Sequence, residues 1–332
     1  MGSQNDILVS VVIPCYNRRD DLRRCLQGLI LQKQNTSHIP AFEVIVVDNG
    51  SEDGTADMLH TEFSSVRLLR NSVNLGASKA RNQALKIILN KYVWFLDSDS
   101  VVENLDSLVW MVKIMEENYD IGSIGGELIK DTQGKVILKS KRILLNGETG
   151  AKSIEPHKAK LVNCDYLATC NCFTRRELLL KIGGFDPDYF VFSEDKELGL
   201  KIKKLGYRNV CDYRTAVFHN ITFSQRRSIF LKYRNVIRFA LKNLSICQIL
   251  IMPFSTVLIK IKVGEDVYRQ LKKDEPAVLK YVPKHLSFFG KLFFLGGMYI
   301  LALLWAYMWN LWHLFPTLKA RFKRRNYIEY DP

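Results

Sequence analysis

Four short apolar runs, each closed by a polar or turn residue, constrain the fold of this chain more than any other feature. They occupy residues 8–14, 42–48, 66–69 and 93–96, are rich in β-branched and aromatic side chains, and alternate with helix-like segments. Runs of this length and composition are typical of strands that are buried on both faces of a parallel sheet. The alternation therefore predicts a Rossmann-like α/β domain with a mostly parallel, doubly wound sheet and right-handed crossovers.

The fourth run ends in two carboxylates that are one residue apart, Asp97 and Asp99. In an open α/β sheet, ligands bind at the carboxyl ends of the strands, and a hard divalent cation takes carboxylate oxygens there. The pattern indicates a nucleotide that is held together with a divalent cation. Taken alone, an Asp-x-Asp pair is equally compatible with an acidic turn in solvent.

Two other nucleotide-binding classes lack their signatures in this sequence. No Gly-x-Gly-x-x-Gly follows the first run, and no Walker lysine loop is present. These glycine-rich loops are what hold the phosphates in dinucleotide oxidoreductases and in P-loop enzymes. Both classes are therefore excluded.

The net charge of +14 is confined to one part of the chain. Residues 1–225 carry 29 Lys and Arg against 28 Asp and Glu, whereas residues 226–332 carry 19 against 6. The basic part is also rich in Leu, Ile, Phe and Trp, which favours an anionic membrane surface as partner. A nucleic-acid partner is not expected, because the basic excess does not extend over the folded domain.

The second half of the α/β region has a different pattern. Short strands and turns are expected over residues 122–154, and a strand that passes into a helix is expected over 162–182. Glu194 and Asp195 then open a helix that ends at Gly206. His219 follows another apolar run.

Five blocks, taken together, resemble family 2 glycosyltransferases with the GT-A fold. In chain order they are VSVVIPCYNR at 9–18, VIVVDNGSEDGT at 44–55, NLGASKARNQAL at 74–85, WFLDSDS at 94–100 and GGFDPDYFVFSEDKELGLKIKKLGY at 183–207. Their order and spacing are those of the family, and they span about two thirds of the chain. The third block and the Glu-Asp helix look most similar to the rhamnosyltransferase-like branch.

The resemblance implies a cation site that holds the diphosphate of a nucleotide sugar. Asp99 would hold Mg²⁺ or Mn²⁺, and Asp97 would reach the ribose or the shell of the metal. His219 resembles the late histidine that completes metal or diphosphate binding in many GT-A enzymes. A lone histidine after an apolar run is also compatible with a purely structural role.

The resemblance also implies where the donor nucleotide lies. Asp48 would read the base, and Pro14, Tyr16 and Asn17 would line the same pocket. A capping acid in a turn is the structural alternative for Asp48.

Two basic residues of the third block are further candidates for donor binding. By resemblance, Lys79 or Arg81 would contact the sugar or the phosphates of the donor. Each is equally compatible with a solvent-exposed position on a helix.

Asp195 is the expected general base, and Glu194 is the alternative base or an acceptor-orienting residue. Asp195 matches the second acid of the family's Glu-Asp pair and lies in the first turn of a helix. A base on the far side of the sugar from the diphosphate implies a single in-line displacement with inversion at the anomeric carbon. Structurally, both acids would also favour a helix start.

The C-terminal third is expected to associate with a membrane. Residues 228–243 have the pattern of a basic amphipathic helix, and two uncharged runs follow at 244–259 and 292–312. The second run is long enough to span a bilayer at about 20 residues per crossing. Either spanning topology places basic loops or the basic tail outside, against the positive-inside rule, so an interfacial or re-entrant arrangement is favoured.

The sequence therefore predicts a GT-A catalytic domain over residues 1–225 and a membrane-associated, mainly helical region over 226–332. The expected function is metal-dependent, inverting transfer of a sugar from a nucleoside-diphosphate sugar to a hydroxyl of a lipid-linked or membrane-proximal glycan. The alternatives are a polyprenyl-phosphate glycosyl synthase and a non-catalytic nucleotide-sugar binding protein. Seven scattered cysteines favour reduced thiols, so the expected location is the cytoplasmic face of the cell membrane.

Overall fold

The computed structural model describes residues 8–35, 39–130, 136–155, 161–219, 227–250 and 303–322, together with 252 and 301. The chain divides into two compact units. The first holds the described residues up to Ile143 and from Thr149 to His219. The second holds Leu144–Glu148 and the described residues from 227 to 322.

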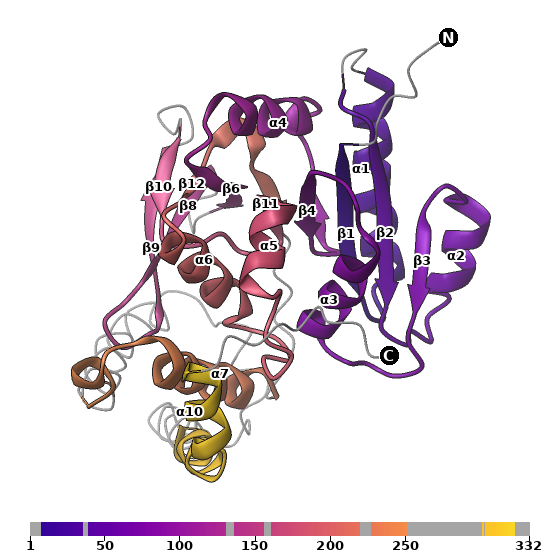
Figure 1. Ribbon diagram of the computed structural model, residues 1–332. Coiled ribbons are helices and arrows are strands. Elements are labelled where there is room, and N and C mark those ends of the chain that lie inside the picture. Colours follow the sequence, from indigo (N-terminus) through magenta and orange to yellow (C-terminus); the bar gives the residue numbers. More distant parts are fainter. Residues whose placement is uncertain are drawn as a thin grey trace, which may run out of the picture. The chain divides into compact units, whose positions relative to one another are not determined.

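The four apolar runs form neighbouring parallel strands of the main sheet, as predicted (Figure 1). The strands are β1 (Val9–Cys15), β2 (Phe42–Asp48), β3 (Arg67–Arg70) and β4 (Tyr92–Leu96), in the spatial order β4-β1-β2-β3. The crossover helices are α1 (Arg19–Asn35), α2 (Thr55–Glu62) and α3 (Ala77–Ile87). Every residue of β4 is buried because the sheet is covered on both faces.

The complete main sheet is mixed. It continues from β4 through β11 (Asn171–Arg175), β6 (Ile121–Gly125), β12 (Arg208–Cys211) and β10 (Val162–Cys164). Strand β11 is antiparallel to both of its neighbours and β10 is antiparallel to β12, whereas β12 is parallel to β6. Six of the eight strands therefore point in the same direction, so the sheet is mostly parallel, as predicted, with β10 and β11 as the antiparallel strands.

The short strands expected over residues 122–154 supply three strands, β7, β8 and β9, of a second, five-stranded sheet. Its order is β5 (Ser100–Val101), β13 (Val217–His219), β7 (Glu127–Lys130), β8 (Val136–Ile143) and β9 (Thr149–Ile154). Strand β5 begins one residue after Asp99, and His219 is paired with Ser100. The end of β4 therefore feeds directly into the second sheet.

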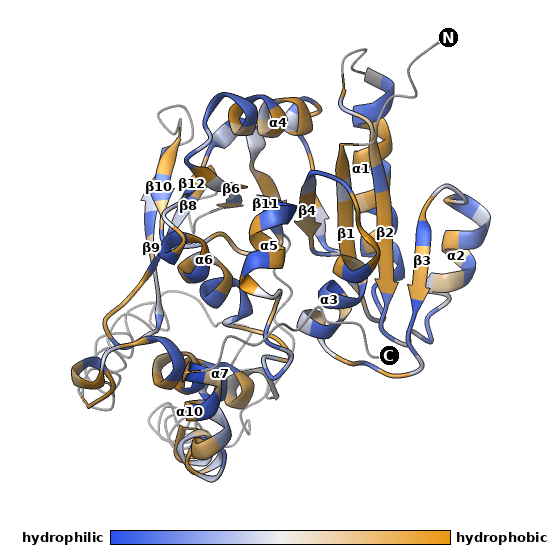
Figure 2. Cartoon of the chain, viewed as in Figure 1, coloured by the Kyte–Doolittle hydropathy of each residue, from blue (hydrophilic) through white to orange (hydrophobic). Residues whose placement is uncertain are grey.

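Two apolar clusters cover the two faces of the main sheet, because neighbouring side chains of each strand point to opposite faces. Helices α1, α2 and α4 (Ser107–Glu117) pack on one face. Helices α3, α5 (Arg176–Ile182) and α6 (Glu194–Lys204) pack on the other. The apolar colouring along β1 and β2 in Figure 2 marks this core.

The second unit contains α7 (Arg227–Asn243) and α10 (Leu314–Phe322). The expected helix is present, but α7 does not carry its basic residues only on an open face. Arg238 and Lys242 are buried, and the Arg238 guanidinium donates to Thr317 Oγ1 at 3.1 Å. The Arg321 guanidinium of α10 donates hydrogen bonds to two backbone carbonyl oxygens at the end of α7. Helix α7 is therefore a packed helix of this unit.

Among the described residues, no helix is both long enough and apolar enough to cross a membrane. Half of the first uncharged run, residues 251 and 253–259, and residues 292–300 and 302 of the second run lie outside the described residues.

Candidate active site

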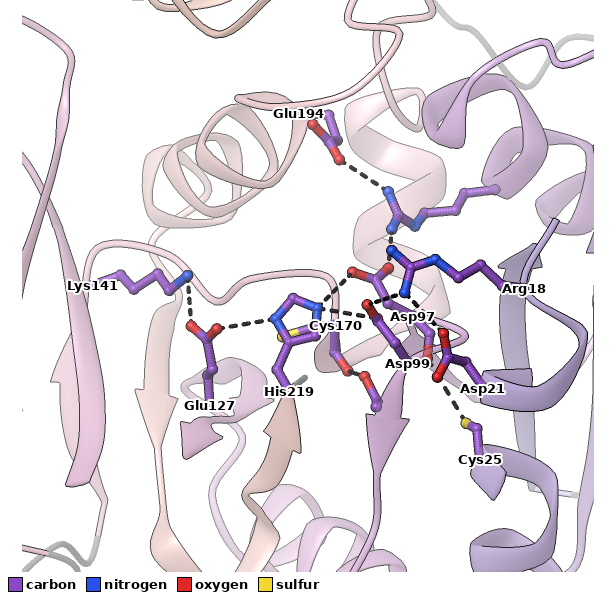
Figure 3. A network of polar contacts seen from close by, with 12 residues as sticks. Arg18, Asp21, Cys25, Asp97, Asp99, Glu127, Lys141, Cys170, Glu194 and His219 are labelled. Atoms are coloured by element: carbon purple, nitrogen blue, oxygen red, sulfur yellow. Dashed lines mark hydrogen bonds and ion pairs between the residues drawn. The ribbon is translucent and has the colours of Figure 1, made fainter. Parts of the chain in front are cut away.

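Asp97 and Asp99 occupy the turn that joins the two sheets. The Ser100 N–H donates to the Asp97 carbonyl oxygen at 3.0 Å, which closes the turn directly after β4. Both carboxylates are partly buried, and both face the imidazole of His219 (Figure 3). The fold thus brings together three predicted site residues that are up to 122 positions apart in the sequence.

His219 and Arg18 hold Asp99 from two sides. Nε2 of His219 lies 3.2 Å from Asp99 Oδ1 and 3.8 Å from Asp97 Oδ2. The Arg18 guanidinium donates to Asp99 Oδ2 at 3.3 Å and to Asp21 at 2.9 Å. The other imidazole nitrogen, Nδ1, lies 3.1 Å from Glu127 Oε1.

These contacts shift the pKa values of His219 and Asp99 in opposite directions. Burial alone would lower the pKa of His219, but hydrogen bonds to Asp99, Cys170 and Glu127 outweigh it and raise that pKa well above its usual value. Burial would raise the pKa of Asp99, yet His219 and Arg18 lower it overall. In the absence of a cation, these contacts therefore favour the protonated imidazole of His219 and the ionised carboxylate of Asp99.

Asp97, Asp99 and His219 have the chemistry and the spacing to hold a divalent cation. One ligand atom from each lies within 4.8 Å of the others. Two carboxylate oxygens and one imidazole nitrogen suit a cation of the Mn²⁺ type, since Mg²⁺ strongly prefers oxygen. The residues present fit the cation that the sequence predicts.

The residues expected to bind the nucleotide lie at the neighbouring strand ends. Cys15, the last residue of β1, pairs with Asp48, the last residue of β2. Pro14 precedes Cys15, while Tyr16 is exposed and Asn17 takes a left-handed conformation with φ of 50°. Because β1 and β2 are parallel, all four predicted residues gather at one edge of the sheet.

Asp48 has one carboxylate oxygen that lacks a hydrogen bond. Its Oδ1 accepts from the Ser51 N–H at 2.9 Å, as a turn acid would. Its Oδ2 is buried and has no hydrogen-bond partner among the described residues, although Arg70 Nε lies 3.4 Å away. An unpaired buried carboxylate oxygen is costly, so this atom is a candidate acceptor for a donor group on a ligand.

The two basic candidates of α3 have different environments. Lys79 is exposed, and no ion pair links it to the described acids of the site. Arg81 is only 2% exposed and bridges two acids, with Nη2 2.8 Å from Asp97 Oδ1 and Nη1 3.1 Å from Glu194 Oε1. Arg81 therefore ties the turn after β4 to the start of α6.

Glu194 and Asp195 begin α6, as the sequence predicts. Burial, with the charge of Asp195 second, raises the pKa of Glu194 to about 7 even though Arg81 opposes the shift. Burial likewise raises the pKa of Asp195, whose Oδ1 accepts from the Lys196 N–H at 2.8 Å. Both acids are held where the ionised form is disfavoured, which is the environment of a proton acceptor.

The loop before α6 is clamped to α3. Asn82 makes two hydrogen bonds with the backbone of Phe185, at 2.7 and 2.9 Å, and Ser78 Oγ donates to the Tyr189 carbonyl oxygen at 3.0 Å. Phe192 and Ser193 end the loop with φ of 69° and 72°, which is strained for residues with a side chain. The third block of the sequence thus fixes the loop that delivers Glu194 and Asp195.

Three charged residues of the site were not predicted as site residues: Arg18, Glu127 and Lys141. Arg18 ends the first sequence block, so its place beside Asn17 was a usable signal. Glu127 and Lys141 lie on β7 and β8, and only the pairing of those strands brings them to His219.

Comparison with known proteins agrees with this fold. Residues 10–183 match the family described as Glycosyl transferase family 2, which is 174 of 332 positions. The chain belongs to this family. Its α/β fold with a mixed sheet is of the GT-A type.

Two curated relatives share parts of the sequence. The chain is 33% identical over 130 residues to the uncharacterized glycosyltransferase YibD of Escherichia coli, covering 38% of this chain and 36% of that protein. It is also 33% identical over 136 residues to a poly(ribitol-phosphate) beta-glucosyltransferase of Bacillus spizizenii, covering 40% of this chain and 20% of that protein. The matches thus span well under half of either relative.

A solved structure with a similar fold is the mannosyltransferase PcManGT from Pyrobaculum calidifontis in complex with GDP-Man and Mn²⁺. The TM-score is 0.55 at 17% identity, over 92% of this chain and 87% of that one. At this identity the likeness concerns the fold.

Proposed function

We propose that this protein transfers a sugar from a nucleoside-diphosphate sugar to a hydroxyl group of a glycan acceptor, with the aid of a divalent cation. The observation that carries the proposal is the convergence of Asp97, Asp99 and His219 at the end of β4. The strand ends that carry Asn17 and Asp48 lie in the same sheet, next to β4. The base of a nucleotide, its diphosphate and a cation can therefore bind along one edge of the main sheet.

Asp97, Asp99 and His219 would hold the cation, and Mn²⁺ suits the imidazole better than Mg²⁺ does. Bound there, a divalent cation supplies positive charge to the leaving diphosphate. Arg18 presents a second positive charge, because its guanidinium lies beside Asp99. Asp48 Oδ2 is free to accept a hydrogen bond from the base of the nucleotide.

Transfer requires one bond to form and one to break at the anomeric carbon. The acceptor oxygen forms the new glycosidic bond, the bond to the diphosphate oxygen breaks, and the diphosphate leaves with the electron pair. Asp195 takes the proton of the acceptor hydroxyl. The single displacement inverts the configuration, and it needs no nucleophilic side chain.

Asp195 is preferred over Glu194 as the base because Glu194 is already engaged. One oxygen of Glu194 pairs with Arg81, which in turn pairs with Asp97. This bridge suits a residue that fixes the start of α6 relative to the cation site. Asp195 lies one residue further on, and burial raises its pKa.

An acceptor near a membrane fits the surface of the second unit. The helical residues 301 and 303–312 and α10 expose apolar side chains at a spacing of three and four, which places them on one helix face. They are Leu301, Leu304, Trp305, Met308, Leu311, Trp312 and Phe315. Trp305 is 69% exposed and Trp312 is 87% exposed.

An apolar face next to basic residues is the pattern of a helix that lies in a lipid interface. Residues 226–332 carry 19 Lys and Arg against 6 Asp and Glu, so an anionic lipid surface complements this region. We therefore place the protein at the cytoplasmic face of the cell membrane, with a lipid-linked or membrane-proximal glycan as acceptor.

Calorimetric binding of nucleoside diphosphates tests the donor site. The full chain in detergent is titrated with UDP, GDP, dTDP and CDP, with and without Mn²⁺. One nucleotide should bind, and its affinity should depend on Mn²⁺. Folded protein that binds none of the four would refute the proposal.

Two variants separate binding from transfer. Asp99→Ala should lose Mn²⁺-dependent nucleotide binding, and transfer with it, because the cation loses a ligand. Asp195→Asn should bind nucleotide as the wild type does but lower transfer by a factor of about 10² to 10⁴, the usual contribution of a general base. Equal, mild effects of the two substitutions would show that the roles are wrongly assigned.

A further inference from the structure

We propose that Glu127, anchored by Lys141, is a positioning residue that fixes the tautomer and the orientation of His219 for cation binding. The inference rests on the cation site of the proposed function. It adds two residues, from β7 and β8, that support the imidazole from behind.

The pairing of three strands explains why these side chains meet. Glu127 on β7 pairs directly with Val217 of β13 and with Lys139 of β8. His219 and Lys141 each lie two residues beyond these partners, so all three side chains point to the same face of the second sheet. His219 belongs to the strand on one side of β7 and Lys141 to the strand on the other, and Glu127 lies between the two side chains (Figure 3).

Each oxygen of Glu127 has its own partner. Oε1 lies 3.1 Å from His219 Nδ1, and Oε2 lies 2.8 Å from Lys141 Nζ. The residue is only 4% exposed, so water does not compete strongly for either oxygen. The Lys141 ammonium beside Oε2 favours the ionised form of this carboxylate.

An ionised carboxylate can only accept hydrogen bonds, so the imidazole nitrogen that faces it must carry the proton. With the proton at Nδ1, the lone pair of the neutral imidazole is at Nε2. Nε2 is the nitrogen that faces Asp99 and Asp97. A carboxylate behind a metal-binding imidazole typically changes metal affinity by 10- to 100-fold.

Lys141 prevents Glu127 from serving as a metal ligand itself. Glu127, Cys170 and His219 also bring ligand atoms within 4.8 Å of one another. The Lys141 ammonium already binds Oε2, however, and His219 Nδ1 faces Oε1, so neither oxygen of Glu127 is open to a cation. The cation is therefore expected on the side of His219 that faces Asp99.

The test is a Mn²⁺ titration of the metal-free full chain in detergent, with free Mn²⁺ measured by electron paramagnetic resonance. Glu127→Gln should weaken Mn²⁺ binding by about 10- to 100-fold. A carboxamide can turn its NH₂ toward Nδ1 and so admit the wrong tautomer. The melting temperature of each metal-free variant checks that the fold is kept.

A double-mutant cycle separates positioning from the loss of a nearby negative charge. A charge effect acts through space and persists when His219 is absent. If Glu127 acts through the imidazole, Glu127→Gln should cost nothing further in a His219→Ala background. An equal loss in both backgrounds would overturn the proposal.

Lys141→Met gives an independent test, because the two explanations predict opposite signs. Removing a cation beside the site should strengthen Mn²⁺ binding if only charge matters. It should weaken binding if Lys141 anchors Glu127. Tighter binding by this variant would overturn the proposal, even if Glu127→Gln failed to fold.

Glu116→Gln is the matched control. Glu116 also accepts hydrogen bonds from a lysine, Lys91, and from a second side chain, Tyr92. These contacts lie at the start of β4, which is the end opposite to Asp97 and Asp99. This variant should bind Mn²⁺ as the wild type does. Wild-type protein that binds no Mn²⁺ would refute the cation site of the proposed function, whereas a wild-type affinity in Glu127→Gln would refute only the role of Glu127.

Discussion

Replacing Glu194 with glutamine is expected to stabilise the metal-free protein more at pH 8 than at pH 5. Burial first, and the charge of Asp195 second, raise the pKa of Glu194 from 4.5 to about 7. The folded state therefore holds this proton more tightly than the unfolded chain does. The contribution of Glu194 to the stability of the wild type must therefore fall as the pH rises through the window between these two values.

The size of the effect follows from the two pKa values. Ionisation of Glu194 lowers the free energy of unfolding by about 1 kcal/mol at pH 5 and by about 3 kcal/mol at pH 8. Glutamine does not titrate. The stability difference between Glu194→Gln and the wild type should therefore become about 2–3 kcal/mol more favourable to the variant between pH 5 and pH 8.

The cysteines provide the assay. All seven are free; six are buried in the first unit, whereas Cys247 is exposed in the second. Samples are equilibrated in urea at either pH and then given a short thiol-labelling pulse at one common pH. Protection of the six buried thiols reports the unfolding of the unit that contains Glu194.

Glu116→Gln again serves as control. The hydrogen bond from Lys91 lowers the pKa of Glu116 from 4.5, so its titration window lies below pH 4.5. Its effect on stability should be nearly the same at pH 5 and pH 8. If the effect of Glu194→Gln were equally independent of pH, or reversed in sign, the reasoning about burial would be refuted.

Two further outcomes follow from the site. Gly76→Ala should cost about 2–4 kcal/mol of stability, because its Cβ would lie 2.6 Å from Phe190 at a φ of 86°. The matched Gly206→Ala, with φ of 90° and nothing within 4 Å, should cost only about 1 kcal/mol in the same urea assay. Each Mn²⁺ bound at pH 7 should release one proton, since the raised pKa keeps His219 protonated without the cation and a ligand must be neutral. Calorimetry in two buffers of different ionisation enthalpy counts this proton, and a count of zero would contradict the assignment of His219.

The parts of the fold that could be predicted are those with local signals. Strands β1, β2 and β4 are apolar runs of strand length, and their parallel pairing puts the polar residues that follow them at one edge. Asp97 and Asp99 could be chosen for that reason. The antiparallel direction of β11 could not, because one short buried strand carries no signal of its direction.

The environment of individual charged residues was harder to predict. Arg81 sits among basic and polar residues of α3, which left donor binding and solvent exposure open. The burial of Arg81 between Glu194 and Asp97 depends on a loop that lies more than a hundred residues further along the chain. Glu127 and Lys141 belong to strands of mixed composition, and their contact with His219 depends on a register that local sequence does not specify.

The hydrogen bonds between α3 and the loop that starts at Phe185 have a consequence for engineering this protein. Ser78 and Asn82 make their bonds to backbone atoms that lie more than a hundred residues further along the chain. A chimera with a crossover point between these two segments takes α3 from one parent and the loop from the other. The position of Glu194 then depends on hydrogen bonds between segments that do not occur together in either parent. Libraries that aim to change acceptor preference should therefore exchange both segments together.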